Sequence, residues 1–402
     1  GLLCDILLPD ANNGNGQQAT ARLTGAAEWR HSMREIGIGL VGYGAMGKVH
    51  SYVYQTLPLY YQDLPFTVRL TGICSRRLEQ ARKAQADLGY AFATDDYDAL
   101  LALPGIDVID ICTPNNLHHD MILKAAAAGK HIYCDKPLTV SSAEAEAVVR
   151  AVRERSLINQ VAFNLRFLPA VMRAKQLIEA GRIGRILSFR AVYLHSGSVD
   201  PARPIGWKLD KAASGGGVLV DMGSHILDLI RYLAGDYRRL AARSRILYAQ
   251  RPDQSGQPVP IANEDSICLI AEMADGSVGT LEASKIATGT QDEMRFELHG
   301  DRGALRFNLM DPNWLYFYDN TLPEQPLGGE RGFTQIECVQ RYAAPGGSFP
   351  SPKTSLGWIR GHVHSLYSFL DCVAAGRRAE PSFADGAVIQ AVMEKAYQAD
   401  QT

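Results

Sequence analysis

The sequence predicts an α/β protein in which a parallel-sheet domain precedes a second α/β domain with a large, mostly antiparallel open sheet. In the first half, short apolar runs alternate with helical stretches from residue 34 to about residue 157, and the runs are apolar throughout. That pattern is typical of a parallel sheet covered by helices on both faces. In the second half, longer runs alternate apolar with polar residues. They indicate antiparallel strands with one face turned from the core.

The elements of the first half follow in order. We expect a helix over 77–89 that ends at Gly89, and a helix over 141–155 that Ser141 or Ser142 caps. Strands are expected at 35–44, which includes a glycine turn, and at 67–75, 106–114 and 131–137, with a further helix at 116–130.

The second half begins with one more strand, at 158–166, and a helix that ends at Gly181. Residues 320–357 are rich in Pro and Gly, so we expect a long loop there. Alternating runs occur at 185–196, 240–250, 265–284, 293–309 and 313–319, and helices are expected at 359–376 and 384–400.

Composition excludes several classes of protein. The chain has 402 residues, and 41 Lys and Arg against 43 Asp and Glu leave a net charge of −2, which argues against a protein built to hold nucleic acid. No run of 18 apolar residues occurs, so we expect no membrane span. Seven scattered cysteines without a C-x-x-C pair indicate a reducing compartment, the cytoplasm.

Residues 1–33 differ from the rest, being rich in Asn, Gln, Gly and Ala without a sustained period. We interpret them as a disordered tag or non-native extension, with the native start at Met33, directly before a strong strand signal.

A glycine-rich turn predicts dinucleotide binding. Gly42, Gly44 and Gly47 form G-x-G-x-x-G between an apolar strand and a plausible helix, with Ala45 and Met46 inside the motif. The first glycine permits the tight turn, the second lets the backbone approach a pyrophosphate, and the third lets helix and strand pack closely. We therefore expect a Rossmann domain. The alternative is a glycine turn that only packs.

The end of the second strand bears on the choice of cofactor. Ser75, Arg76 and Arg77 stand where a carboxylate would bind the ribose 2′-hydroxyl of NAD. A hydroxyl and guanidinium groups suit a 2′-phosphate, which favours NADP over NAD. The arginines could instead begin a solvated helix, or stack on adenine.

Lys136 follows the strand at 131–137, at the edge where ligands of open α/β sheets bind. A lysine beside a nicotinamide can donate a hydrogen bond to a substrate hydroxyl or move a proton. Without further context, a Lys-Pro pair is more often a surface lysine.

Asp221 and His225 follow three glycines and are four residues apart, so on a helix they share a face. A neutral imidazole can take a hydroxyl proton while hydride leaves the same carbon. The alternative is a helix-capping Asp with a core-facing His.

These segments together resemble the glucose–fructose oxidoreductase / inositol dehydrogenase / rhizopine-catabolism (Gfo/Idh/MocA) family. The resemblance covers about residues 34–400. It rests on the glycine turn, on CTPNNLH (112–118) with GKHIYCDKP (129–137), and on GGGVLVDMGSHILDL (215–229), and it extends to 165–186, 299–307 and 380–397.

The resemblance implies roles for individual residues. Lys136 matches the catalytic lysine of the family's E-K-P motif, with Asp135 in place of the Glu. His225 is implied as the general base, and Asp221 as its partner. The turn after the third strand is implied to lie along the cofactor, through Thr113, Pro114, Asn115 and His118. Further candidates to contact the substrate are Asn164, Arg166, Tyr193 and Trp207, with His195 and Lys208 beside them.

The sequence therefore predicts a dinucleotide-binding domain at 34–157, a substrate-binding and oligomerisation domain at 158–357, and helices at 358–402 that pack back toward the first domain. The expected function is NAD(P)-dependent transfer of a hydride between nicotinamide and a secondary hydroxyl of a sugar, sugar derivative or cyclitol. The alternatives are an NAD-dependent glycosidase with a tightly bound cofactor, and a non-catalytic cofactor sensor. We expect a homodimer or homotetramer formed through the open sheet. His362 and His364 form H-x-H, but no third ligand has convincing spacing, so no metal site is expected.

Overall fold

The computed structural model describes residues 33–327, 329–339, 349–351 and 353–400. The interpretation of residues 1–33 therefore lies outside the described residues, apart from Met33 itself.

The first half of the chain forms a parallel sheet, as the apolar runs predict. Its strands are β1 (Arg34–Val41), β2 (Phe66–Cys74), β3 (Phe92–Thr94), β4 (Val108–Ile111), β5 (His131–Cys134) and β6 (Asn159–Val161). They lie side by side in the order β3-β2-β1-β4-β5-β6. β4 is buried along its whole length and β1 from Ile36 onward, because helices cover both faces.

Five helices connect these strands. They are α2 (Ala45–Tyr60), α3 (Leu78–Leu88), α4 (Tyr97–Leu101), α5 (His118–Ala127) and α6 (Ser142–Glu154). Two expected ends are confirmed: Gly89 ends α3 in the left-handed conformation, and the hydroxyl of Ser141 accepts from the backbone N–H of Glu144 at the start of α6. The expected strand at 158–166 is shorter, because the chain turns after Val161 into a 3₁₀ turn (Asn164–Phe167) that leads into the next helix.

The second half forms an eight-stranded sheet. Its strands are β7 (Ile186–Leu194), β8 (Tyr237–Arg245), β11 (Ser266–Met273), β12 (Val278–Ser284), β13 (Glu293–Gly300), β14 (Gly303–Asn308), β15 (Trp314–Asp319) and β16 (Phe333–Glu337). Their order is β16-β15-β14-β13-β7-β12-β11-β8, and every pair is antiparallel except β7 and β12. The predicted fold class is therefore confirmed. The expectation of a loop throughout 320–357 is wrong in part, because β16 adds an edge strand there.

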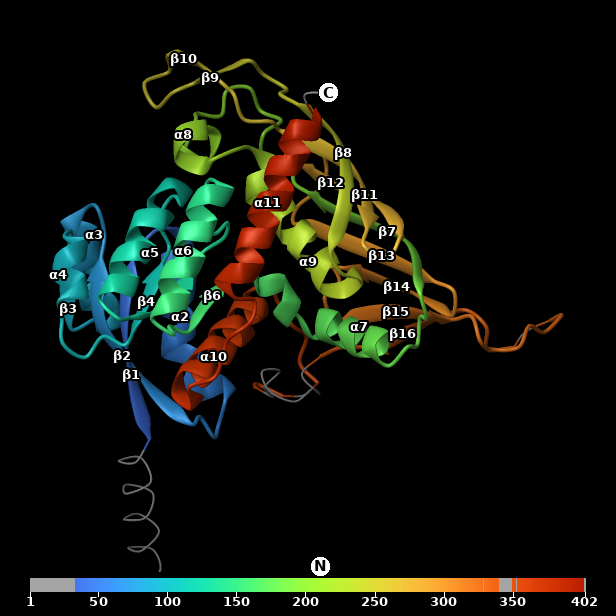
Figure 1. The fold of residues 1–402 in the computed structure, drawn as a ribbon, viewed down its shortest axis with the longest axis horizontal. Coiled ribbons are helices and arrows are strands. Elements are labelled where there is room, and N and C mark those ends of the chain that lie inside the picture. The colour runs from blue at the N-terminus through green and yellow to red at the C-terminus, as the bar shows by residue number, and fades with distance from the viewer. Residues whose placement is uncertain (1–32, 328, 340–348, 352, 401–402) are drawn as a thin grey trace, which may run out of the picture.

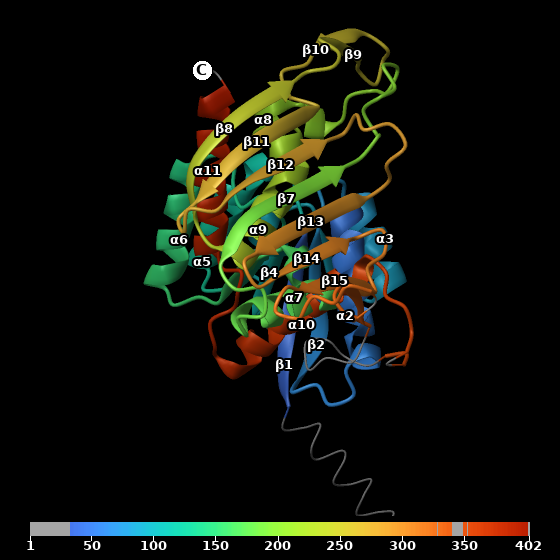
Figure 2. The same ribbon diagram turned by 90° about the vertical axis from the view of Figure 1, so that its right-hand side faces the viewer.

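Helices cover one face of the large sheet. They are α7 (Pro169–Glu179), α9 (Ser224–Ala234) and α11 (Phe383–Asp400), and α10 (Ile359–Ala375) packs on α2 and β1 of the parallel sheet. In Figure 1, α11 runs between the two sheets, and it contacts both α6 and β8. Figure 2 shows the other face of the large sheet with no helix in front of it.

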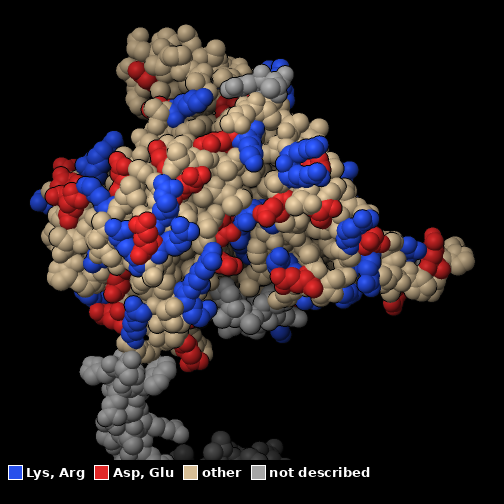
Figure 3. Space-filling view, viewed as in Figure 1, with Lys and Arg blue, Asp and Glu red and all other residues tan. Residues whose placement is uncertain are grey.

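A small lobe lies beyond the sheets. It holds the two-stranded ribbon of β9 (Gln250–Pro252) and β10 (Pro258–Pro260), next to the short helix α8 (Lys211–Ser214) at the top of Figure 1. Acidic and basic side chains alternate over the face drawn in Figure 3, without a large patch of one sign. Among the described helices, none combines the length and apolar character that a membrane crossing requires.

Candidate active site

A cavity of about 1050 Å³ lies at the carboxyl ends of the parallel strands. Residues from both halves of the chain line this cavity. The predicted residues that line it are Gly42, Gly44, Ala45, Met46, Ser75, Arg76, Arg77, Thr113, Pro114, Asn115, Asp135, Lys136, Asn164, Tyr193, His195, Trp207, Lys208, Asp221 and His225. Gly47, His118 and Arg166 are not among the residues that line it.

The glycine turn fits a pyrophosphate. Gly42 has φ +94°, and a Cβ on Gly44 would meet no atom within 4 Å, which leaves open space above the turn. A Cβ on Gly47 would lie 2.1 Å from the carbonyl oxygen of Gly42, so this glycine permits close packing instead. No side chain of the described residues caps the N-terminus of α2, and its first turn holds no acidic residue. The free N–H groups and the helix dipole there suit an anion.

The end of β2 supplies the expected groups for the adenosine half. Ser75, Arg76 and Arg77 line the cavity, and both arginines are exposed. Asp95, which follows β3, lines the same end beside them. This carboxylate was not among the predicted site residues, because it follows the short edge strand β3 rather than β2.

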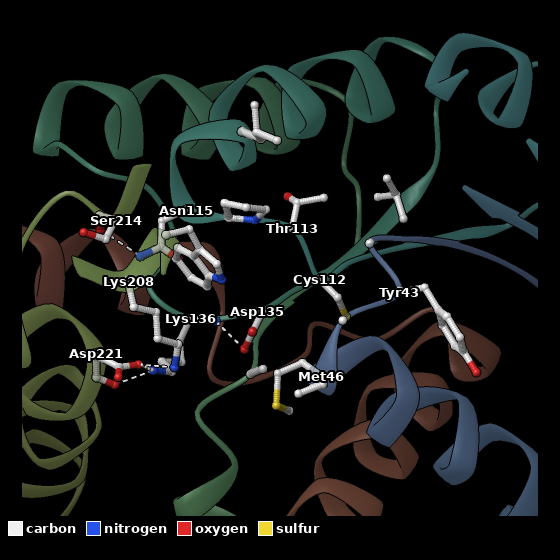
Figure 4. A pocket seen from close by; sticks show the side chains of 18 of the residues that line it. Tyr43, Met46, Cys112, Thr113, Asn115, Asp135, Lys136, Lys208, Ser214 and Asp221 are labelled. Atoms are coloured by element: carbon white, nitrogen blue, oxygen red, sulfur yellow. Dashed lines mark hydrogen bonds and ion pairs between the residues drawn. The ribbon is translucent and has the colours of Figure 1, made fainter. Parts of the chain in front are cut away.

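The turn after β4 is held by its own hydrogen bonds. The side-chain amide of Asn115 donates to the carbonyl of Ser214, 2.8 Å away, which ties this turn to the second half of the chain (Figure 4). The ring nitrogens of His118 lie 2.9 and 3.0 Å from the carbonyl oxygens of Pro137 and Thr113. His118 thus links the segments that follow β4 and β5 without lining the cavity. Burial lowers the pKa of its imidazole.

Lys136 and Asp221 meet in the cavity. The Nζ of Lys136 lies 3.1 Å from Oδ1 of Asp221 and also donates to the backbone carbonyl of that residue. Two more ammonium groups reach the same carboxylate: Lys208 lies 2.7 Å from Oδ1, and Lys285 lies 3.1 Å from Oδ2. Although burial alone would raise it, the three lysines hold the pKa of Asp221 well below its ordinary value. The resemblance implied that Asp221 pairs with His225. Among the described residues, the carboxylate of Asp221 instead forms ion pairs with Lys136, Lys208 and Lys285.

Local structure explains why Asp221 is placed there. It lies in a single π turn (Leu219–Gly223) that runs directly into α9, and such turns are frequent at functional sites. The carboxylate of Glu264 accepts from the backbone N–H groups of Gly217 and Leu219 and so fixes the start of the turn. A Cβ on Gly217 would lie 2.2 Å from the carbonyl oxygen of Glu264. The absence of a side chain at Gly217 therefore lets the backbone of the π turn pack closely against Glu264.

His225 is one turn further along and is half-buried beside aromatic rings. Its ring lies 5.9 Å from that of Tyr193 and 6.2 Å from that of Phe163. Burial and the positive charge of Lys136 lower the pKa of His225 well below its ordinary value, so the imidazole is neutral at pH 7. Its Nδ1 is buried without a hydrogen-bond partner among the described residues.

The candidate substrate residues divide into two groups. Asn164 is buried in the cavity wall, and its side-chain Nδ2 lacks a partner among the described residues. The hydroxyl of Tyr193 donates to Asp292, 2.8 Å away, and Trp207 is 40% exposed at the rim. Arg166 instead forms a buried bidentate pair with Asp228, at 2.8 and 2.5 Å, behind the cavity.

A second buried polar cluster lies beneath the cofactor end. His50, Asp110 and Cys112 are close enough to share a metal ion. However, Asp110 already accepts from His50 Nδ1 at 3.0 Å and from the Tyr54 hydroxyl at 2.7 Å, and burial raises the pKa of the Cys112 thiol well above its ordinary value. We assign no ion to this cluster.

Two residues of the charged cluster were underestimated from the sequence. Lys208 was only a weak candidate, and Lys285 was missed. Lys285 directly follows β12, which pairs in parallel with β7, so it lies at the same edge as His195. A polar residue directly after an alternating strand could have indicated Lys285 as a candidate. The sequence does not show, however, that this strand pairs in parallel with β7, which is what places Lys285 at the edge near the cavity.

Comparison with known proteins identifies the family. Residues 36–163 match the model of an oxidoreductase family with an NAD-binding Rossmann fold, and residues 171–306 match that of the GFO/IDH/MocA C-terminal domain. This chain belongs to the Gfo/Idh/MocA family of oxidoreductases. The resemblance noted in the sequence is thus confirmed, and the protein is an NAD-dependent dehydrogenase of that family.

Individual relatives agree with this assignment. Levoglucosan dehydrogenase from Pseudarthrobacter phenanthrenivorans is 34% identical over 367 residues, which span 88% of this chain and 93% of that protein. The scyllo-inositol 2-dehydrogenase (NAD(+)) from Bacillus subtilis is 34% identical over 56% of this chain and 62% of its own length. A solved structure of levoglucosan dehydrogenase in complex with NADH and levoglucosan has 33% identity and a TM-score of 0.85, and covers 92% of this chain and 97% of that one. These findings support NAD(H) binding, and none favours NADP.

Proposed function

We propose that this dehydrogenase oxidises a secondary hydroxyl of a neutral sugar, anhydrosugar or cyclitol, or catalyses the reverse reduction. The observation that carries the proposal is the convergence of Lys136, Asp221 and neutral His225 in one cavity with the glycine turn. Relatives named for levoglucosan and for inositols support this substrate class.

In this proposal His225 accepts the hydroxyl proton. A bound nicotinamide ring supplies the hydride acceptor. His225 is suited to its task because burial and Lys136 keep it unprotonated, so that its ring nitrogen can act as a base.

Lys136 holds the reacting oxygen. Burial lowers the pKa of its ammonium, while the carboxylate of Asp221 acts in the opposite direction and favours the charged form. An ammonium group beside the oxygen stabilises negative charge as the proton leaves. Asp221 positions the lysine, and Asn164 offers its free amide N–H to a second hydroxyl.

The choice between NAD and NADP depends, in our proposal, on Asp95. The prediction of NADP from Ser75, Arg76 and Arg77 has no support among the relatives. We propose that the carboxylate of Asp95, at the same end of the cavity, accepts from the adenosine ribose and disfavours a 2′-phosphate. On this proposal the arginines stack on the adenine or remain in solvent.

We further propose that the chain works as a homo-oligomer through the open sheet face and resides in the cytoplasm. An apolar patch lies near one edge of that face, on β11, with Ile270 58% exposed next to exposed Cys268, and with Arg243 and Glu282 beside it. A second copy of the same face would cover the apolar residues and pair opposite charges. The six cysteines that the structure describes all carry free thiols, which supports a reducing compartment.

The function is tested with purified protein against a panel of anhydrosugars, aldoses and cyclitols, with NAD and NADP in turn, by the absorbance of the reduced nicotinamide. We expect NAD-dependent oxidation of at least one member. His225→Ala and Lys136→Ala should each lower kcat by roughly 10²–10⁴-fold and leave the Kd of NADH nearly unchanged. His299→Ala, on β13, is the control. Hydrolysis of a glycoside without net reduction of NAD would favour the glycosidase instead.

A further inference from the structure

His362 is a buried polar side chain that the mechanism above does not use. It lies on α10, lines the cavity and is 3% exposed. Neither of its ring nitrogens has a hydrogen-bond partner among the described residues. Buried polar atoms are nearly always paired in folded proteins, so an imidazole with both nitrogens free inside a cavity indicates that a ligand supplies the partner.

The surroundings of His362 keep its ring neutral. Burial and the positive charges of His50 and Lys136 lower the pKa of His362 well below its ordinary value. The carboxylate of Asp110 faces His50 and raises the pKa of that imidazole, although burial opposes the shift. A neutral imidazole offers one donor and one acceptor, the pattern that matches an amide or a hydroxyl rather than an anion.

The position of His362 along the cavity distinguishes between these ligands. Met46 and His50 are one turn apart on α2, so they share a face. Met46 lines the cavity from within the glycine motif, in the first turn of α2, and the His50 ring lies 5.9 Å from that of His362. His362 is thus reached by following α2 inward from the pyrophosphate position, at the end away from Ser75 and Arg76.

A neighbouring aromatic ring fixes the orientation of His362. The ring of Trp358 lies 4.4 Å from it, and Trp358 also lines the cavity. Figure 4 shows Asp221, Lys208 and Lys136 together, with Met46 apart from Asp221 and Lys208, and His362 lies close enough to Lys136 and His225 for their charges to interact. A planar group with its own donor and acceptor, bound between Met46 and Lys136, fits the space beside His362.

We propose that His362 binds the carboxamide of the nicotinamide ring, accepting a hydrogen bond from its NH₂ group, and so fixes the rotation of the ring beside Lys136. The inference rests on the proposed function, because it requires a dinucleotide in the cavity. His362 is a positioning residue in this scheme, since it touches the cofactor away from the carbon that gains the hydride.

The test compares two reduced dinucleotides in the absence of sugar. NADH carries the carboxamide, and reduced 3-acetylpyridine adenine dinucleotide replaces its NH₂ group with a methyl group. Binding is followed by energy transfer from tryptophan to the dihydropyridine ring. We expect the wild type to bind NADH about tenfold more tightly than the analogue, which corresponds to one hydrogen bond of about 1.4 kcal/mol. H362L should bind both equally and weakly, and H362N should recover part of the difference. H299L, at a half-buried histidine of β13, is the matched control.

The outcomes separate this inference from the proposed function. Equal affinity of the wild type for the two dinucleotides overturns the role of His362 and requires no variant. Full discrimination retained in H362L, with a raised KM for the sugar only, also overturns it and assigns His362 to the substrate. If H362L does not fold, as judged by circular dichroism, H362N and the wild-type comparison decide. Absence of NADH binding to the wild type would defeat the proposed function itself.

Discussion

The carboxylate of Asp221 binds Lys285 through Oδ2 at 3.1 Å, on the side opposite the oxygen that faces Lys136. Lys285 follows β12, does not line the cavity and has a side chain that is 13% exposed. The pair therefore joins the end of the large sheet to the π turn that carries Asp221. Lys285 holds Asp221 in the orientation in which Asp221 holds Lys136.

We expect Lys285→Met to impair catalysis through this orientation. Loss of one ammonium–carboxylate hydrogen bond costs roughly 1.5–3 kcal/mol, so kcat should fall by roughly 10- to 150-fold while the Kd of NADH changes little. Lys285→Arg should recover most of the activity, because a guanidinium can reach the same oxygen. Steady-state kinetics and thermal unfolding of both variants provide the measurement. A raised KM with unchanged kcat would contradict the positioning role.

Lys208 should influence the pH dependence of sugar oxidation. The base must be unprotonated, and burial together with Lys136 and Lys208 lowers the pKa of His225, so kcat/KM in the wild type falls only well below pH 6.5. Lys208→Met removes a positive charge and raises the pKa of His225, which shifts the acid limb of the profile to higher pH. Lys211→Met, on the nearby helix α8, should leave the profile unshifted. A shift to lower pH would show that His225 is not the titrating base.

Asp95 should determine the preference for NAD. On our proposal, Asp95→Asn removes the charge that repels a 2′-phosphate, while Arg76 and Arg77 remain to attract it. We expect the ratio of kcat/KM for NAD to that for NADP to fall about tenfold or more, chiefly through KM. Asp96→Asn, the next residue, caps α4 and is the control. An unchanged ratio in Asp95→Asn would contradict the proposal.

Arg166 should prove to be structural. It forms a buried ion pair with Asp228, so Arg166→Ala leaves a buried carboxylate unpaired, which costs roughly 3–5 kcal/mol. We expect a fall of several degrees in Tm, with the KM of the sugar nearly unchanged in protein that remains folded. Thermal unfolding and kinetics on the same preparation measure both. A large rise in KM at unchanged Tm would restore the role in substrate binding that the sequence analysis expected.

The open sheet face should carry the oligomer. Ile270→Asp places a charge in the middle of its apolar patch and should yield monomers at micromolar concentration, as measured by light scattering. Leu59→Asp changes a residue of similar exposure, 57% against 58%, on the distant helix α2, and should leave the assembly intact. Monomers in the wild type would contradict the proposal outright.

The sequence predicted those parts of the molecule that depend on neighbours along the chain. The glycine turn, the strand ends that carry Lys136 and the helical spacing of Asp221 and His225 follow from local patterns, so the fold class and the residues lining the cavity were accessible. Contacts between distant segments were not. Arg166 pairs with Asp228 rather than facing the cavity, and Lys285 reaches Asp221, because of how α9 and β12 pack, which no local pattern specifies.

The short edge elements were hidden for a related reason. β3 has three residues and β16 has five, too few for periodicity to show, and each is stabilised by one neighbouring strand. Asp95 was missed with β3. The role that we propose for His362 could not be predicted either. The sequence of an amphipathic helix does not show whether the ring nitrogens of a histidine will find hydrogen-bond partners in the folded protein.

The cavity wall is assembled from positions as far apart as Gly42 and His362, and α10 must return to α2 before that wall is complete. Because α10 also supplies buried side chains to the core on one face of the parallel sheet, a ribosome-bound chain that has not yet released its last helices leaves both that core and one side of the nucleotide chamber incomplete. Completion of that core and of the chamber therefore both wait for the end of translation, and we expect a chain truncated before α10 to be unstable as well as inactive.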